Sequence, residues 1–83
     1  MDRDEYAKMI DEVETDYSKN HFDRFIEGAI FLRKLGAGGV SAEHDEICFY
    51  GLDIVDVSED DAKKLRILGF MFYEEYNGFV IFV

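Results

Sequence analysis

The stretch Ser41-Ala42-Glu43-His44-Asp45-Glu46-Ile47-Cys48-Phe49-Tyr50 decides the fold class of this chain. Its composition predicts two extended segments, residues 40–43 and 47–52, joined by a turn with an acidic tip. Helical periodicity precedes this hairpin, and a third helix and a second hairpin follow it. We therefore expect an α+β fold in the order α-α-β-β-α-β-β, with one four-stranded antiparallel sheet packed by helices.

Two amphipathic helices are predicted before the hairpin. Residues 2–17 carry apolar side chains at intervals of three and four, which places one apolar stripe on a helix. The second helix runs from an N-cap at Asn20 to Leu35, and Gly36 suits the left-handed residue beyond its end. A single bent helix over residues 2–35 is the alternative. The second helix is the least acidic part of the chain, so we expect it to be the buried element.

Residues 36–39 contain three glycines and predict a flexible connector. A phosphate-binding glycine loop needs a strand before it and the N-terminus of a helix after it. Here a helix precedes the glycines and a strand follows them. The pattern therefore favours a hinge over an anion site.

A third helix is predicted after residues 52–57, which alternate apolar and acidic residues and are expected to cross the sheet edge. Ser58 has the side chain of an N-cap, and the acids at 59–61 lie in the first turn, where the helix dipole favours negative charge. Gly69 suits the end of this helix. Helix capping thus explains part of the local acidity.

The last strands, residues 70–74 and 79–83, form a hairpin through a loop that contains Asn77-Gly78 and holds two or four residues. Both of its faces are largely apolar, so the sheet must be covered on both sides or offer one side to a partner. With three helices available, we expect the chain to cover itself. Alternation places Phe70, Phe72, Phe79, Ile81 and Val83 on one face, and Met71, Tyr73, Val80 and Phe82 on the other.

The composition indicates one small globular domain, residues 1–83, with a helical part (1–35) and a ββαββ part (36–83). Apolar residues make up 48% of the chain, with five tyrosines and eight phenylalanines to fill a core. No stretch is long and apolar enough for a membrane span, and the acidic start lacks the pattern of a secretory signal. One cysteine fits a reducing compartment. We expect a cytoplasmic protein.

The formal net charge of −10 narrows the classes of partner. Nucleic acid and anionic membrane surfaces would be repelled, whereas a basic protein surface would be attracted. The alternative is that the charge serves solubility alone. From 36 to 61 the chain contains eight carboxylates and no Lys or Arg.

Catalytic, metal and cofactor sites are not expected. His44 and Cys48 suggest a nucleophile–base pair, but residues four apart in a strand are separated by about 13 Å, although a turn could bring them closer. No residue pattern orients the histidine or forms an oxyanion site. His21 and the acids beside His44 lack a recognisable ligand spacing, and a single cysteine excludes a four-thiolate zinc site. The acidic segment 53–61 lacks the ligand pattern of a calcium loop. The sequence predicts a binding protein and no enzyme.

Three segments resemble small acidic uncharacterised proteins of bacteriophages and mobile elements. They are Ser41 to Ile47, the run Ser58-Glu59-Asp60-Asp61 with its helix to Phe70, and Glu74-Glu75-Tyr76 with the final Phe82-Val83. The chain is similar in class to phage anti-defence inhibitors, including anti-CRISPR and anti-restriction proteins. The resemblance implies a stoichiometric inhibitor that covers a basic nucleic-acid-binding surface of a host protein.

Two binding modes are expected from these observations. In the first, carboxylates replace phosphates in contacts with Arg and Lys of a partner. In the second, the protein self-associates as a homodimer through an apolar sheet face made of Met71, Tyr73, Val80 and Phe82. The candidate contacts of the first mode are Glu43, His44, Asp45, Glu46, Asp53, Asp56, Glu59, Asp60 and Asp61.

Overall fold

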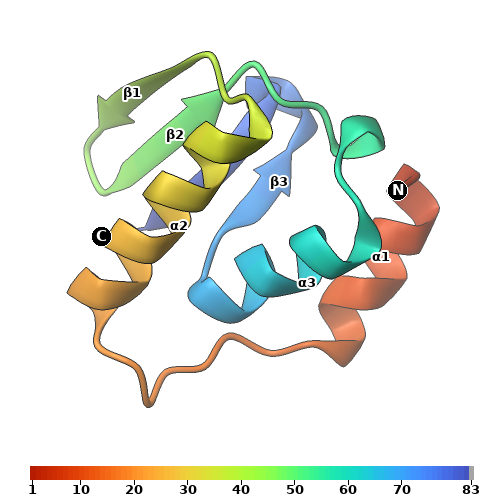
Figure 1. Cartoon of the computed structure of the whole chain (residues 1–83), viewed down its shortest axis with the longest axis horizontal. Helices are drawn as coiled ribbons and strands as arrows, with labels where there is room; N and C mark the ends of the chain where they lie inside the picture. The colour runs from red at the N-terminus through yellow and green to blue at the C-terminus, as the bar shows by residue number, and fades with distance from the viewer. Residues whose placement is uncertain (83) are drawn as a thin grey trace.

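A computed structural model describes residues 1–82 and confirms the α+β class and the predicted order of elements (Figure 1). Two short 3-10 helices, η1 and η2, are added to that order. The elements are α1 (Arg3–Glu12), α2 (His21–Leu35), β1 (Gly39–Glu43), β2 (Glu46–Tyr50), η1 (Ile54–Asp56), α3 (Glu59–Leu68), β3 (Met71–Tyr73), η2 (Glu74–Tyr76) and β4 (Gly78–Phe82).

The four strands form one antiparallel sheet in the order β1-β2-β4-β3. The two hairpins therefore join through their later strands, β2 and β4. One row across the sheet reads Val40, Phe49, Phe79 and Phe72, and the next row reads Ser41, Cys48, Val80 and Met71. Successive rows point to opposite faces. We call the face with Phe49 and Phe79 the inner face and the face with Cys48 and Val80 the outer face.

The predicted helix ends are confirmed at both glycines and both caps. Asn20 Oδ1 accepts a hydrogen bond from the Phe22 backbone N–H at 2.8 Å, and Gly36 has a φ of 109°. Ser58 Oγ accepts from the Asp61 N–H at 3.2 Å, and Gly69 has a φ of 96°. The non-helical residues before Asn20 separate α1 from α2, so the single bent helix over residues 2–35 is wrong.

The first helix is shorter than expected, because it ends at Glu12 and not near residue 17. Arg66 of α3 stops it: Nε donates to the Val13 carbonyl oxygen at 2.9 Å and Nη2 to that of Ile10 at 3.3 Å. The chain then runs along α3, where Thr15 Oγ1 donates to the Arg66 carbonyl oxygen. These tertiary bonds replace a further turn of helix and leave Tyr17 exposed.

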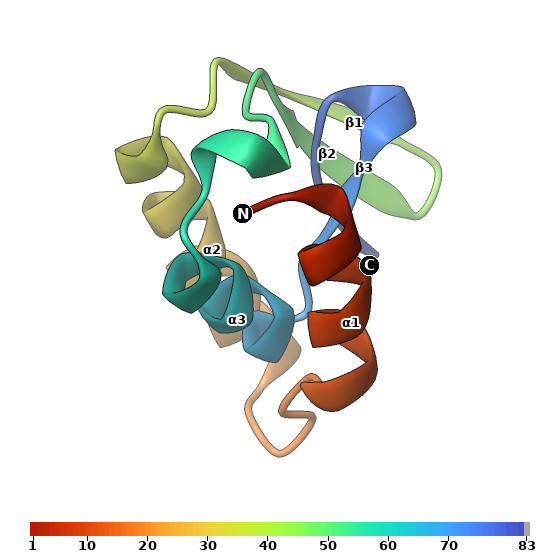
Figure 2. The same cartoon turned by 90° about the vertical axis from the view of Figure 1, so that its right-hand side faces the viewer.

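All three helices lie on the inner side of the sheet (Figure 2). The inner-face residues Phe49 and Phe79 share one buried cluster with Leu32 of α2 and Leu65 of α3. Cys48 and Val80 on the outer face are also buried, but they lie outside that cluster. The chain covers the sheet itself, as expected, but the three helices contribute only to the inner face. The outer face is covered by aromatic side chains of the sheet and of η2.

The second helix is not the buried element, contrary to expectation. Phe22 is 70% and Ile30 54% exposed, and the buried residues of α2 are Arg24, Gly28 and Leu32. The helix packs on the sheet through Gly28, where an added Cβ would overlap the ring of Phe70. A flank of α2 therefore faces solvent although its residues are apolar.

Residues 52–57, which were expected to cross the sheet edge, form no strand. They contain η1, whose N-cap Asp53 accepts a hydrogen bond from the Val55 N–H at 3.2 Å. Leu52, Ile54 and Val57 are buried in the main cluster, and the acids between them point outward. The alternation of apolar and acidic residues thus reflects buried and exposed positions around a 3-10 turn, and not the two faces of a strand.

Candidate functional site

The nine predicted contact residues fall into two groups on opposite sides of the molecule. The turn group lies at the β1–β2 turn, and the η1–α3 group lies on η1 and at the start of α3. Figure 1 places the turn at the left edge and the start of α3 at the right. The turn group is Glu43, His44, Asp45 and Glu46, and the η1–α3 group is Asp53, Asp56, Glu59, Asp60 and Asp61.

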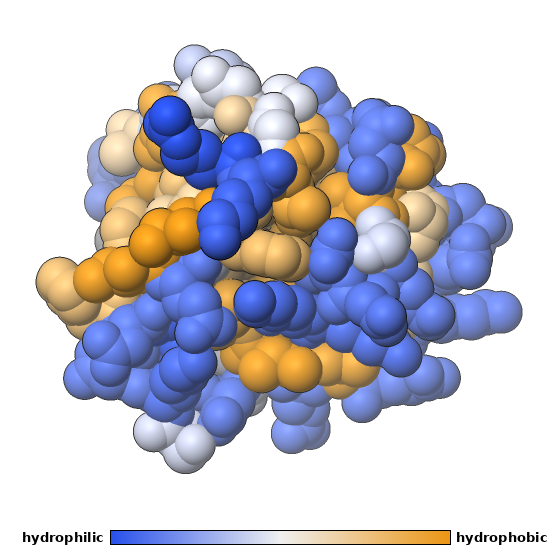
Figure 3. Space-filling model, in the orientation of Figure 1, coloured by the Kyte–Doolittle hydropathy of each residue, from blue (hydrophilic) through white to orange (hydrophobic). Residues whose placement is uncertain are grey.

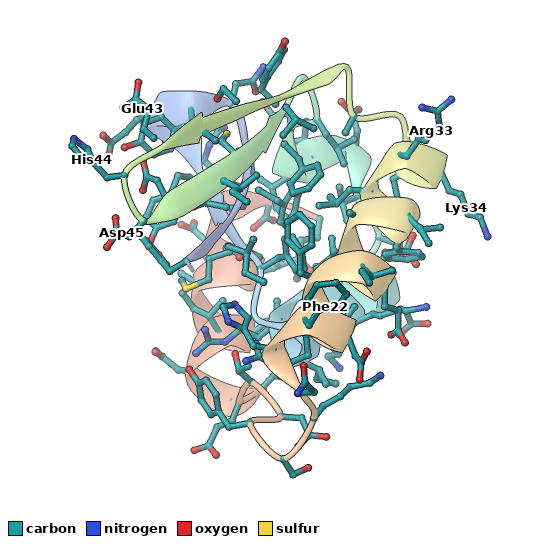
Figure 4. The ribbon with its side chains drawn as sticks, turned by 90° about the vertical axis from the view of Figure 1, so that its left-hand side faces the viewer. Phe22, Arg33, Lys34, Glu43, His44 and Asp45 are labelled. Carbon is teal, nitrogen blue, oxygen red and sulfur yellow. The ribbon has the colours of Figure 1, made fainter. Side chains whose placement is uncertain are left out.

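The turn group projects from the body on a two-residue connection, His44-Asp45, between Glu43 and Glu46. His44 has a φ of 47°, a left-handed conformation that the tight hairpin imposes. Glu43, His44 and Asp45 are exposed and Glu46 is half-buried. Figure 4 shows the three exposed side chains spreading away from the end of β1.

An acidic pocket lies beside this turn on the outer face. It has a volume of about 70 Å³ and is lined by Ser41, Glu43, Glu46, Cys48 and Tyr76. The negative charge of Glu46 is the main cause that raises the pKa of the Tyr76 phenol, and Glu75 and Glu43 act in the same direction. Two carboxylates, Glu43 and Glu46, therefore share this pocket with Tyr76, and the charge of Glu75 acts on the same phenol.

No positive charge compensates these carboxylates. Among residues 1–82, the ion pairs within 4.0 Å involve Arg3, Lys19 and Lys63, and none of them reaches the turn group. Burial, followed by the charge of Glu46, also raises the pKa of the Cys48 thiol on the pocket floor. The pocket is thus a concentrated negative site at the surface.

The η1–α3 group is largely engaged within the protein. Asp53 caps η1 and lies 3.5 Å from Arg3, while Glu59 lies 3.9 Å from Lys63. The acids of α3 also occupy the first helical turn, where the helix dipole stabilises them. This group therefore has local structural roles that the turn group lacks.

Tyr76, which lines the acidic pocket, and its neighbour Glu75 were not among the predicted contacts. They belong to η2, in the four-residue loop between β3 and β4. They reach the turn group because β4 pairs with β2, which brings the ends of the two hairpins together. The sequence carries the acid-acid-tyrosine run, but no local pattern indicates that strand pairing.

The residues predicted for self-association lie on the outer face, as alternation indicated. Val80 is fully buried, Met71 and Tyr73 are half-buried, and Phe82 is 49% exposed. The ring of Tyr73 packs against those of Tyr76 and Phe82, with centroids 6.0 and 6.4 Å apart. Self-association through this face stays a prediction.

Chemistry based on His44 and Cys48 finds no geometric support. His44 projects from the turn, Cys48 is buried at 7% exposure, and no hydrogen bond joins them in the described part of the chain. Within residues 1–82 no group of three or more His, Cys, Asp or Glu side chains is placed to hold a metal ion. No helix in the same range is long and apolar enough to cross a membrane.

A comparison of this chain with protein-family models, with curated proteins and with solved structures finds no match. These comparisons therefore assign neither a family nor a function to the chain.

Proposed function

We propose that this protein is a non-catalytic acidic binding protein that covers a basic, nucleic-acid-binding surface of another protein. The observation that carries the proposal is the small pocket shared by Glu43, Glu46 and Tyr76, for which residues 1–82 supply no ion-pair partner. Like charges that line one pocket repel each other in the unbound protein. A cation supplied by a partner removes that repulsion.

The partner group with the best fit is an Arg or Lys side chain. Its charged end would enter the acidic pocket beside the carboxylates of Glu43 and Glu46, and its stem or guanidinium plane would lie against the Tyr76 ring. Asp45 and His44, at the exposed turn, would contact a neighbouring basic residue. Carboxylates held on a hairpin in this way act as substitutes for the phosphates of a nucleic acid.

The resemblance to phage anti-defence inhibitors extends this proposal to the class of partner. A nucleic-acid-binding protein of a host defence system carries a basic groove that such a hairpin could occupy, in the cytoplasm of the host cell. Association driven by uncompensated charge is fast and weakens with ionic strength. The proposal therefore includes salt-sensitive binding.

The experiment compares two charge reversals of equal size. Glu46→Lys with Glu75→Lys, the pocket variant, reverses two charges that act on Tyr76, and Asp60→Lys with Asp61→Lys alters the η1–α3 group on the opposite side. The tagged wild-type protein and both variants are used to capture proteins from a host lysate at low and high salt. The captured protein is then purified and its binding to DNA and RNA is measured with and without the acidic protein.

We expect the pocket variant to lose capture and inhibition, and the α3 variant to retain most of both. Circular dichroism verifies that each variant is folded. Equal capture by the wild type and the folded pocket variant would contradict the proposal, and so would a captured protein that still binds its nucleic acid.

A further inference from the structure

The sheet has one open edge and one closed edge. At the closed edge, β3 is only three residues long, and its Phe72 N–H donates to the Tyr6 hydroxyl of α1 at 2.8 Å. At the open edge, β1 is five residues long, and four of these residues, Val40–Glu43, are exposed. Every second residue of β1 turns its N–H and C=O away from β2. Such an edge is a template for another strand unless charge, Pro or a covering element blocks it.

An apolar surface lies next to this open edge. Val40 on the inner face of β1 is 57% exposed, and the flank of α2 exposes Phe22, Ile26 and Ile30. Between the helix and the hairpin lie two hollows of about 490 and 270 Å³, lined mainly by apolar residues that include Phe25, Ile47 and Phe49. Figure 3 shows apolar atoms exposed over α2 among hydrophilic side chains. Exposed apolar area beside an open strand edge is typical of an interface.

Opposite charges lie at the two ends of β1. The acidic end is the turn with Glu43 and Asp45, and the basic end is the last turn of α2, with Arg33 and Lys34 just before the connector to β1. Figure 4 shows these two sets at opposite ends of the strand. Within residues 1–82, none of the four side chains takes part in an ion pair.

We propose that the open edge of β1 binds the β1 edge of a second copy of this chain in antiparallel orientation, forming a two-fold symmetric dimer with a continuous eight-stranded sheet. In this dimer residues 39–43 of the two copies pair in antiparallel orientation, with the two Ser41 residues opposite each other. The acidic turn of each copy then lies beside the basic end of α2 of the other copy. A two-fold interface must be self-complementary, and a strand with one acidic and one basic end meets that condition.

The same symmetry explains the exposed flank of α2. The two-fold axis of an antiparallel strand pair is perpendicular to the sheet, so the inner faces of both copies lie on one side. The two α2 helices then approach each other over the new strand pair. Val40, Ala42 and the α2 residues Phe22, Ile26 and Ile30 become covered.

The dimer engages Glu43 and Asp45 of the turn but leaves the rest of the proposed binding site accessible. Glu46 and Tyr76 line the pocket on the outer face, whereas the helices meet on the inner side. Each dimer therefore presents two acidic pockets. The dimer rests on the edge, the apolar flank and the end charges, so it can hold whether or not the acidic pocket binds a basic partner.

The experiment is a charge-swap cycle followed by sedimentation velocity and light scattering. Arg33→Glu with Lys34→Glu makes both ends of β1 acidic, and Glu43→Lys with Asp45→Lys makes both ends basic. We expect the wild type to have twice the 9.7 kDa chain mass. Each double variant alone should dimerise about tenfold more weakly than the wild type, because like charges then face each other at both ends of the strand pair. An equimolar mixture of the two variants should form a heterodimer, because opposite charges then meet at both ends.

Two controls separate this interface from other causes. Lys8→Glu with Lys63→Glu has the same net charge as the Arg33 and Lys34 variant but changes α1 and α3, so it should dimerise more strongly than that variant. Val40→Lys places a charge on the edge strand and the apolar flank, and it should give a monomer with an unchanged circular dichroism spectrum. Capture of the basic partner by the folded Val40→Lys variant tests the acidic pocket independently of the dimer.

Three results would overturn the proposal. The first is a wild type that is still monomeric at about 100 µM, because the affinity of the dimer would then be too low for a specific association. The second is a mixture of the charge-swapped variants without heterodimer. The third is a dimer that persists in Val40→Lys but is lost in Phe82→Ser, because the interface would then be the outer face.

Discussion

The ring of Phe70 lies directly against the backbone of Gly28, so α2 packs on the start of β3 through a residue without a side chain. Both residues are buried, and Phe70 has no exposed surface at all. This close approach fixes the position of α2 over the sheet while its flank stays in solvent.

Gly28→Ala should therefore destabilise the protein. In an exposed helix interior the same change stabilises by about 0.5–1 kcal/mol. Here the added methyl group overlaps an immobile ring, and overpacking of this kind costs about 1–3 kcal/mol. Urea denaturation gives the free energy of unfolding of both proteins. The double variant Gly28→Ala, Phe70→Leu should recover part of the loss, and a more stable Gly28→Ala variant would show that the contact is not tight.

Arg24 is the charged side chain whose loss should cost the most stability. It is 8% exposed; Nη1 donates to the Leu68 carbonyl oxygen at 3.1 Å, and Nε donates to that of Lys19 at 3.2 Å. Arg24→Met should lower the free energy of unfolding by about 1–3 kcal/mol, because the buried Leu68 carbonyl at the end of α3 loses its side-chain donor. Lys8→Met, an exposed change on α1, is the matched control. Equal effects of the two changes would refute this role for Arg24.

The β1–β2 turn should become more stable when its first residue tolerates a left-handed backbone. His44 has a φ of 47°, a conformation that Asn adopts more readily and Val adopts at high cost. We expect His44→Asn to be neutral or stabilising by up to about 0.5 kcal/mol and His44→Val to destabilise by about 1–2 kcal/mol. Thermal unfolding of the two variants measures the order, and the reverse order would contradict the turn geometry.

The acidic pocket predicts a pH dependence through Tyr76. Its phenol pKa is raised in the folded protein, chiefly by the charge of Glu46, so the folded state keeps this proton to higher pH than the unfolded state does. The stability linked to Tyr76 is fully present below the unfolded tyrosine pKa of about 10 and is lost as pH rises through the folded pKa. The difference between the absorbance titrations of the wild type and of Tyr76→Phe isolates the Tyr76 phenol. Glu46→Gln should shift the midpoint to lower pH, and an unchanged midpoint would show that Glu46 is too far away to act.

Several parts of this structure could be predicted because they depend on neighbouring residues alone. The caps at Asn20 and Ser58 and the left-handed glycines Gly36 and Gly69 are local hydrogen-bond and steric requirements, and all four are confirmed. Alternation in the strands likewise placed Phe72 and Phe79 on one face and Val80 on the other.

Other parts could not be predicted, because they depend on which distant element meets a given residue. Apolar spacing predicted that α1 would continue to residue 17, but Arg66, 53 residues away from Val13, ends it. The least acidic helix was expected to be buried, yet only its Gly28 side approaches the sheet. The acidic tip was visible in the sequence, whereas the pocket that Glu43 and Glu46 share with Tyr76 required the pairing of β2 with β4.

The sequence by itself thus determined the fold class, the helix caps and the two faces of each strand, since these follow from backbone periodicity and short-range hydrogen bonding. Only the tertiary structure decided the strand order, the side on which all three helices pack and the flank of α2 that remains exposed. The physical reason is that burial is shared between elements. An apolar stripe indicates which residues can be buried, and the packing of the other elements decides whether they are buried.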